Sequence, residues 1–133
     1  MSTAHQNKVK QLFSNLQNSL DVMFNWEVLR YTIKFYGEEY ERALRRGVKV
    51  RFITDKAKDS EIQKIIQPLK EIGSVEVRKA TLFRLSPIVI FDNKIVDIIT
   101  STDNIEVLRV SHQNLVSSMH DYFELKWRSA HKQ

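Results

Sequence analysis

The segment Ser86-Pro-Ile-Val-Ile-Phe-Asp-Asn-Lys-Ile-Val-Asp-Ile-Ile-Thr-Ser101 contains two short apolar runs separated by three polar residues. The runs, at 88–91 and 95–99, are rich in β-branched side chains, which favour strands. Between them, Asp92 and Asn93 are residues that form tight hairpin turns readily. The segment therefore predicts a β-hairpin.

Upstream of this hairpin, helix and strand patterns alternate along the chain. Apolar residues recur at helical spacing over about 5–18, from 26 to about 46, and over 59–72, so each of these ranges predicts a helix. Pro68 is expected to kink or shorten the third helix. Asn25 is the expected cap of the second helix and Asp59 or Ser60 that of the third. The intervening runs 20–24, 48–54 and 75–78 predict strands.

Downstream of the hairpin, the pattern predicts one more strand and one more helix. Residues 105–110 alternate as a strand, and Ser111 is the expected cap of a final helix. The apolar stripe of this helix is expected to comprise Leu115, Met119, Tyr122, Phe123, Lys126 or Trp127, and Ala130.

The predicted order is α-β-α-β-α-β-β-β-β-α. Strand–helix–strand units favour parallel pairing with right-handed crossovers, and the hairpin adds antiparallel strands. We therefore expect an α/β fold: a mixed β-sheet with helices on both faces. Residues 1–19 are interpreted as an N-terminal helix that can connect to an upstream DNA-binding or signalling domain, and residues 20–133 as one globular domain.

Composition narrows the class of protein. The 133 residues include no cysteine, which excludes disulfides and thiolate chemistry. No apolar run approaches the roughly 18–20 residues of a membrane span, and the N-terminus lacks the apolar core of a secretory signal, so a cytoplasmic location without membrane contact is the default expectation. The net charge of +5 is compatible with nucleic acid, but the charges of both signs are dispersed, which favours an ordinary solvated surface.

Several motifs together resemble the phospholipase D superfamily. The run Arg46-Gly-Val-Lys-Val-Arg-Phe-Ile-Thr54 is similar to a central strand of such domains, and Val75-Glu-Val-Arg78 resembles the strand that leads into their hairpin. Asp121-Tyr-Phe-Glu-Leu-Lys-Trp127 is similar to the closing helix of sensor and effector domains in archaeal TrmB-like transcription regulators and archaeal signalling proteins. The resemblance covers about residues 20–130 and implies a phospholipase D-like half-domain.

The signature of that superfamily is His-x-Lys-x-x-x-x-Asp followed by a Gly-Ser turn. With Asp92 at the motif aspartate, Leu85 occupies the histidine position and Pro87 the lysine position. Thr100-Ser101, or Ile99-Thr100, stands at the Gly-Ser position. The resemblance assigns the nucleophile to the histidine and phosphoryl neutralisation to the lysine, so their loss removes the means of catalysis. We therefore expect no enzyme activity and no catalytic residue.

A ligand site is a separate expectation. In α/β sheets, ligands bind beyond the carboxyl ends of the strands, and arginines there suit phosphate or carboxylate. The candidates for binding a small anion are Arg51, Thr54, Arg78, Arg84, Asp92, Thr100, Ser101 and His112, with Lys79 and Asp55 nearby. The alternative is that Arg51 and Arg78 face solvent or pair with Glu76 or Asp97.

The remaining histidines and aromatic residues fit structural roles. The four histidines show no metal-ligand spacing, so no metal and no cofactor is expected. Core packing is the ordinary role of the aromatic residues on helix stripes, which are Trp26, Tyr36, Tyr40, Tyr122, Phe123 and Trp127, and some of them could instead form an interface. The resemblance implies a homodimer with the vestigial sites facing each other. The expected function is a non-catalytic sensor or interaction domain of a transcription regulator or signalling protein; the alternative is a nucleic-acid-binding domain derived from a nuclease.

Overall fold

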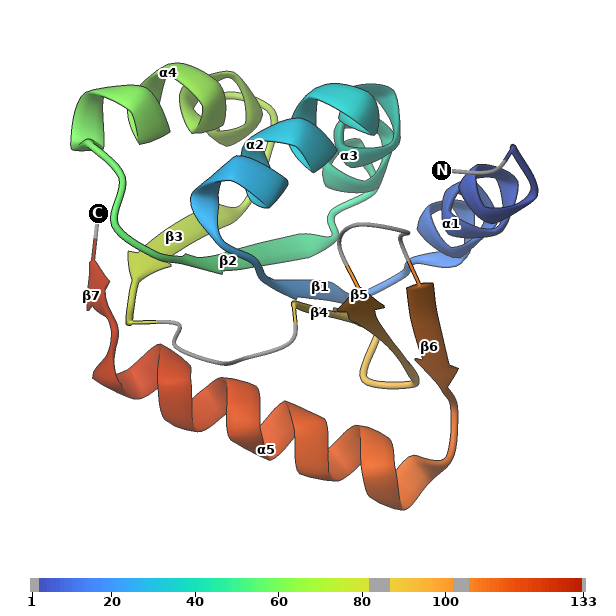
Figure 1. Cartoon of the computed structure of the whole chain (residues 1–133). Coiled ribbons are helices and arrows are strands. Elements are labelled where there is room, and N and C mark those ends of the chain that lie inside the picture. Colours follow the sequence, from blue (N-terminus) through green and yellow to red (C-terminus); the bar gives the residue numbers. More distant parts are fainter. Residues whose placement is uncertain (1–2, 82–86, 102–105, 133) are drawn as a thin grey trace.

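A computed structural model describes residues 3–81, 87–101 and 106–132. These residues form a seven-stranded sheet in the order β6-β5-β4-β1-β2-β3-β7, with α1 to α4 on one face and α5 on the other (Figure 1). This arrangement confirms the expected α/β class with helices on both faces of a mixed sheet. The helices are α1 (Thr3–Asn15), α2 (Trp26–Phe35), α3 (Gly37–Arg45), α4 (Asp59–Lys70) and α5 (Gln113–Ser129). The strands are β1 (Ser19–Met23), β2 (Lys49–Thr54), β3 (Val75–Lys79), β4 (Ile88–Phe91), β5 (Ile95–Ser101), β6 (Glu106–Val110) and β7 (His131–Lys132).

The sheet has a parallel half and an antiparallel half. β1, β2 and β3 run parallel, joined by crossovers through α2–α3 and α4. β4 pairs antiparallel with the central strand β1, and β5 and β6 extend the sheet as a meander. The predicted hairpin is confirmed: Asp92 and Asn93 have φ angles of 55° and 54° and form its turn, the left-handed geometry that a two-residue connection needs.

The two faces of the sheet enclose separate apolar cores because strand side chains alternate. On the face of α1–α4, Leu20 and Val22 of β1 are buried with Phe52 of β2. On the opposite face, Met23 and Ile53 pack with Phe123 and Trp127 of α5. Within the described ranges, no helix is both long and apolar enough to span a bilayer.

The expected single helix over 26–46 is wrong, because two helices meet at Tyr36. Tyr36 has φ −103° and ψ 28°, and its N–H still donates to the carbonyl of Thr32 as the end of α2. α3 then begins at Gly37. Glycine is a poor residue for a helix interior. Tyr36 and Tyr40, on either side of the break, are both buried in the core.

Two predicted caps are also wrong. α4 begins at Asp59 with Lys58 as its N-cap, and the acidic residue instead lies in the first turn, where it suits the helix dipole. α5 is preceded by His112 rather than Ser111 as N-cap. The predicted cap Asn25 is confirmed, since its side-chain oxygen accepts a 2.9 Å hydrogen bond from the N–H of Val28.

The buried stripe of α5 differs from the expected one, and one strand was missed. Val116, Phe123 and Trp127 are buried, whereas Leu115 is 56% exposed. Phe123 and Trp127 belong to the expected stripe, so the difference lies in the first turn of the helix, where Val116 is buried in place of Leu115. The two-residue strand β7 pairs with β3 and is too short to leave a pattern in the sequence.

Candidate functional site

The motif aspartate, Asp92, binds the backbone at the start of the central strand β1. The carboxylate of Asp92 accepts hydrogen bonds from the backbone N–H groups of Gln17, Asn18 and Ser19 at 2.9, 2.8 and 2.9 Å. The N–H of Asp92 in turn donates to the carbonyl of Ser19 at 2.8 Å. Asp92 therefore joins the hairpin turn to the α1–β1 connection, at the opposite end of β4 from Pro87.

At the positions aligned with the histidine and lysine of the motif, the structure describes Pro87 but not 82–86, so Arg84 and Leu85 lie outside the described residues. Pro87 is half-buried, and its carbonyl accepts a 2.9 Å hydrogen bond from the N–H of Ile99. β5 continues through the position of the Gly-Ser turn to Ser101, with a register irregularity between Ile99 and Ser101. At this edge of the sheet, the backbone at Pro87 is therefore paired with β5, and β5 is paired with β6 as far as Ser101.

Arg51 lies on the α5 face of β2, between two carboxylates and two rings. Its guanidinium donates to Asp21 at 2.8 Å and to Glu124, and its central carbon lies 5.0 and 5.1 Å from the ring centroids of Phe123 and Trp127. Burial alone would lower the pKa of Arg51, but the hydrogen bonds to the two carboxylates raise it above its ordinary value. The hydrogen bond from Arg51 also holds the pKa of Glu124 below its usual range.

Arg78 fastens the end of α5 to the sheet. Its guanidinium donates to the carbonyl of Trp127 at 2.7 Å and lies 4.1 Å from the centroid of the Trp127 ring. The partners considered from the sequence, Glu76 and Asp97, are thus not the ones that these arginines have: Arg51 pairs with Asp21 and Glu124, and Arg78 with Trp127.

Other predicted site residues are spread over the molecule. Thr54 is buried at the carboxyl end of β2, and its hydroxyl has no hydrogen-bond partner among the described residues. Thr100 is exposed and donates to the carbonyl of Glu106 at 3.2 Å. His112 is exposed before α5 and makes no side-chain cap bond. The structure therefore brings Arg51 and Arg78 together under α5, but not with Thr100, Asp92 or His112.

A depression of about 310 Å³ adjoins Arg51 at the amino ends of the parallel strands. Lys49 and Arg51 line it, but so do the carboxylates of Asp21 and Glu76. An anion here would meet both signs of charge. Across the described part of the chain, no group of three or more His, Asp or Glu side chains is placed to hold a metal ion.

Sequence reasoning missed a buried ion pair on the other face of the sheet. Asp97 of β5 is 5% exposed and accepts two hydrogen bonds from Arg109 of β6, at 2.7 and 2.8 Å. The signal was present: Asp97 interrupts an otherwise apolar strand, where a charge must be paired to be buried. The partner, however, becomes known only with the register of β5 and β6.

A cavity of about 70 Å³ lies beside this pair, between α1, the α2–α3 pair and the β4–β6 strands. Its walls are mainly apolar and aromatic. They are lined by His5, Val9, Phe13, Phe24, Thr32, Tyr36, Tyr40, Val89, Phe91, Asp97, Ile99 and Val107. This cavity could not be predicted from the sequence, because its residues come from elements up to about 100 positions apart.

Comparisons with known proteins identify the fold. No protein-family model matches the chain, and no curated protein matches it significantly. Among solved structures, TrmBL2, an archaeal chromatin protein with a novel mode of DNA binding, is 21% identical with a TM-score of 0.73 over 96% of this chain and 50% of that chain. The chain thus spans half the length of TrmBL2.

Two further solved structures carry the same arrangement. NucT from Helicobacter pylori is 16% identical, with a TM-score of 0.67 over 98% of this chain and 91% of that one. Phosphatidylserine synthase from Haemophilus influenzae is 12% identical, with a TM-score of 0.56 over 95% of this chain and 36% of that one. At these identities the likeness establishes architecture alone. The chain has the phospholipase D-like fold, in the form of one half-domain.

Proposed function

We propose that this chain is a non-catalytic sensor or interaction domain of a transcription regulator or signalling protein, and that it acts as a dimer. The observation that carries the proposal is Leu85 and Pro87 at the two positions where a phospholipase D-like enzyme needs a nucleophile and a cation. Neither side chain can attack or neutralise a phosphoryl group. The fold is retained while the catalytic groups are absent.

The role of Asp92 supports this proposal. Its carboxylate accepts hydrogen bonds from three backbone N–H groups at the α1–β1 connection. The aspartate therefore has a structural reason to be present without chemistry. This explains how part of the motif can stand in a chain whose other motif positions hold Leu85 and Pro87.

The test of the missing activity is a phosphodiester hydrolysis assay. The purified protein is incubated with bis(p-nitrophenyl) phosphate and separately with single- and double-stranded DNA. No product above the protein-free blank is expected. Turnover that co-elutes with the folded protein through two chromatography steps would contradict the proposal.

The outer side of α5 supports dimerisation through a second copy of the chain. Leu115 and Leu125 are 56% and 64% exposed there, and the half-buried Tyr122 lies between them on the same side of the helix. Exposed apolar side chains that line up on one helix are typical of an interface. In that dimer the resemblance implies that the two vestigial edges face each other.

Light scattering tests the dimer. We expect a mass of twice the 15.7 kDa of one chain. Leu115→Glu combined with Leu125→Glu should halve the measured mass, because burying two carboxylates in an apolar contact is strongly unfavourable. Gln63→Glu, which adds a charge at an exposed position of α4, is the matched control and should leave the mass unchanged. A monomer at every concentration would remove this part of the proposal.

Binding of a small anion remains a prediction of the sequence. The arginines predicted for it, Arg51 and Arg78, are engaged with α5, so an anion would have to displace Glu124 or the Trp127 carbonyl. Titration with inorganic phosphate, followed by the amide signals of β2 and β3, tests this binding. Loss of α5 protection on phosphate addition is the expected signature if the arginines change partners.

The second candidate function is nucleic-acid binding. It is favoured by the net charge of +5 and by the fold shared with TrmBL2, a chromatin protein described as binding DNA. Fluorescence anisotropy with labelled DNA and RNA across a salt series measures it. Binding that appears at about 50 mM salt and falls steeply at higher salt would favour this function, because phosphate contacts release counterions.

A further inference from the structure

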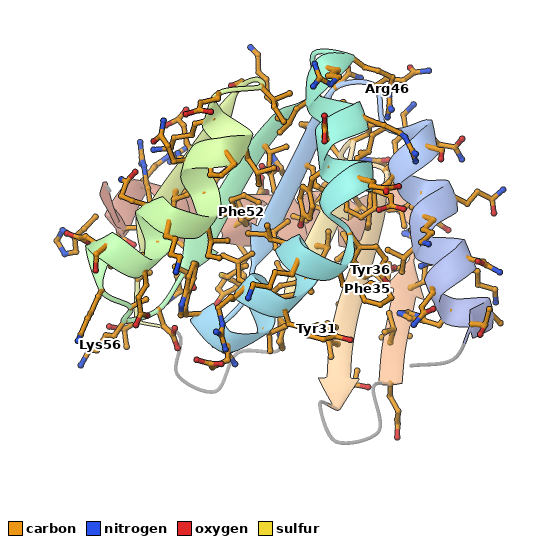
Figure 2. All side chains as sticks on the ribbon, turned by 90° about the horizontal axis from the view of Figure 1, so that it is seen from above. Tyr31, Phe35, Tyr36, Arg46, Phe52 and Lys56 are labelled. Carbon is orange, nitrogen blue, oxygen red and sulfur yellow. The ribbon has the colours of Figure 1, made fainter. Side chains whose placement is uncertain are left out.

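The cavity under α1 continues to the surface as a chain of aromatic rings. Tyr31 stacks on Phe35 with ring centroids 5.9 Å apart, Phe35 meets Tyr36 edge-on at 4.8 Å, and Tyr36 stacks on Phe13 at 5.7 Å. Tyr31 and Phe35 are 54% and 38% exposed. Figure 2 shows Tyr31, Phe35 and Tyr36 on the side of α2 that faces α1. An aromatic rim therefore leads into an aromatic cavity.

The side chains that line this cavity have little net charge with which a ligand could interact. Its one buried carboxylate, Asp97, is neutralised by two hydrogen bonds from Arg109. Burial lowers the pKa of His5, which favours a neutral imidazole at neutral pH. An ion that entered would lose its hydration without finding an opposite free charge. The cavity therefore suits an uncharged molecule.

The location of the cavity is also that of a binding site. Ile99 lines it, and the N–H of Ile99 donates to the carbonyl of Pro87 at 2.9 Å, so one wall adjoins the vestigial catalytic edge. Ligands of α/β proteins gather at the carboxyl ends of parallel strands, and Phe24, directly after β1, lines the same cavity. An apolar pocket with a few polar groups is the usual form of a small-molecule site.

We propose that this cavity and its aromatic rim bind a small neutral molecule that carries one aromatic ring. The volume of about 70 Å³ is near half that of an engineered cavity of roughly 150 Å³ that encloses benzene. The cavity therefore encloses only part of a ring, and the rest of the ring lies against Phe35 and Tyr31 at the rim. His5 and Thr32 contribute polar atoms to the cavity lining, and the Thr32 hydroxyl already donates to the carbonyl of Leu29 at 2.9 Å.

This inference rests on the proposed sensor function for its biological meaning, because the occupant would contact α1. Val9 and Phe13 of α1 form one wall of the cavity and are buried against the rest of the core. A molecule bound there adds contacts to the inner face of α1 and so stabilises its docked position. The state of the cavity is thereby transmitted to the N-terminal helix.

Phenol is the probe, observed by NMR of ¹³C-labelled methyl groups in the full chain. The methyl signals of Val9, Val89 and Val107 are expected to shift with a Kd on the order of 1 mM, which is ordinary for a ligand of so few atoms. Intermolecular NOEs from the phenol ring to these methyls place the ligand independently of any mutation. Hydrogen exchange in α1 should slow in parallel.

Variants on the two faces of β6 provide a matched pair. Val107 lines the cavity, whereas Leu108 is exposed on the opposite face of the sheet. Val107→Phe fills the cavity and should weaken phenol binding at least tenfold, while Leu108→Phe leaves it unchanged. Replacing Tyr31 and Phe35 together by Ser should weaken binding roughly threefold to tenfold, the usual worth of aromatic pairing.

The inference is overturned if phenol at ten times that Kd shifts none of the three methyls, or if the NOEs place it elsewhere. Equal binding by Val107→Phe and the wild type would also overturn it. Phosphate at the same concentration serves as the charged comparator and should leave these methyls unperturbed. A phosphodiesterase activity would contradict the proposed function, and a monomeric protein would remove its dimer part. Either result would leave this binding result standing, so the two failures are distinguishable.

Discussion

Replacing Asp92 by Ala tests whether the motif aspartate has a structural role. The substitution removes the acceptor of three N–H groups, two exposed and one partly buried. The exposed N–H groups recover water, at a net cost of about 0.5–1 kcal/mol each, and the partly buried N–H of Ser19 costs about 1 kcal/mol or more. Ala is also unfavourable by about 1 kcal/mol at the φ of 55° that Asp92 adopts.

Together these terms predict a loss of about 3 kcal/mol in the free energy of unfolding, or roughly 10 °C in Tm for a chain of this length. Urea unfolding followed by circular dichroism measures the loss. Asp92→Asn keeps one acceptor oxygen and tolerates the same φ, so it should lose only about 1 kcal/mol. If Asp92→Ala were destabilised by less than about 0.5 kcal/mol, the structural role assigned to this carboxylate would be wrong.

Three further predictions concern the charges under α5 and the glycines. The pKa of Glu124 is held below its ordinary value of 4.5. Its contribution to the free energy of unfolding is therefore complete above pH 4.5 and is lost as the pH falls through the folded-state pKa. The stability curves of the wild type and Glu124→Gln should converge in acid, and parallel curves would contradict this. Arg51→Leu leaves Asp21, 2% exposed, without its ion-pair partner and should cost about 3–5 kcal/mol in urea unfolding, most of it recovered when Asp21 is also replaced by Leu. Gly47→Ala should cost about 1 kcal/mol in the same assay because Gly47 has a φ of 94°, whereas Gly37→Ala at the open start of α3 should be neutral or stabilising; equal effects would refute the argument from backbone conformation.

The strands other than β7 were predictable because each carries its own signal. β2 and the β4–β5 hairpin are alternating or apolar runs of β-branched residues, and Asp92-Asn93 specifies the turn. The break at Tyr36 was missed because the apolar stripe continues through it: Ile33 and Tyr40 are buried on either side as they would be on one helix. Gly37 was the only local sign of the break.

The site was less predictable than the fold because its contacts join distant parts of the chain. Arg51 and Glu124 are 73 residues apart, and Arg78 and Trp127 are 49 apart. Position on a strand suggested that the arginines could reach a ligand, but only the packing of α5 shows that they already have partners. Composition and spacing contain no information about which long-range partner fills a given position.

The placement of Arg51 and Arg78 bears on how the chain behaves while it is synthesised. β1, β2 and β3 leave the ribosome well before α5, which begins only at Gln113. One face of the nascent parallel sheet is therefore exposed to water until α5 is synthesised. On that side, Asp21, Arg51 and Arg78 interrupt the greasy surface with charge. We expect this hydrated half-sheet to resist aggregation with other nascent chains until α5 is synthesised and the guanidinium groups bind the indole of Trp127.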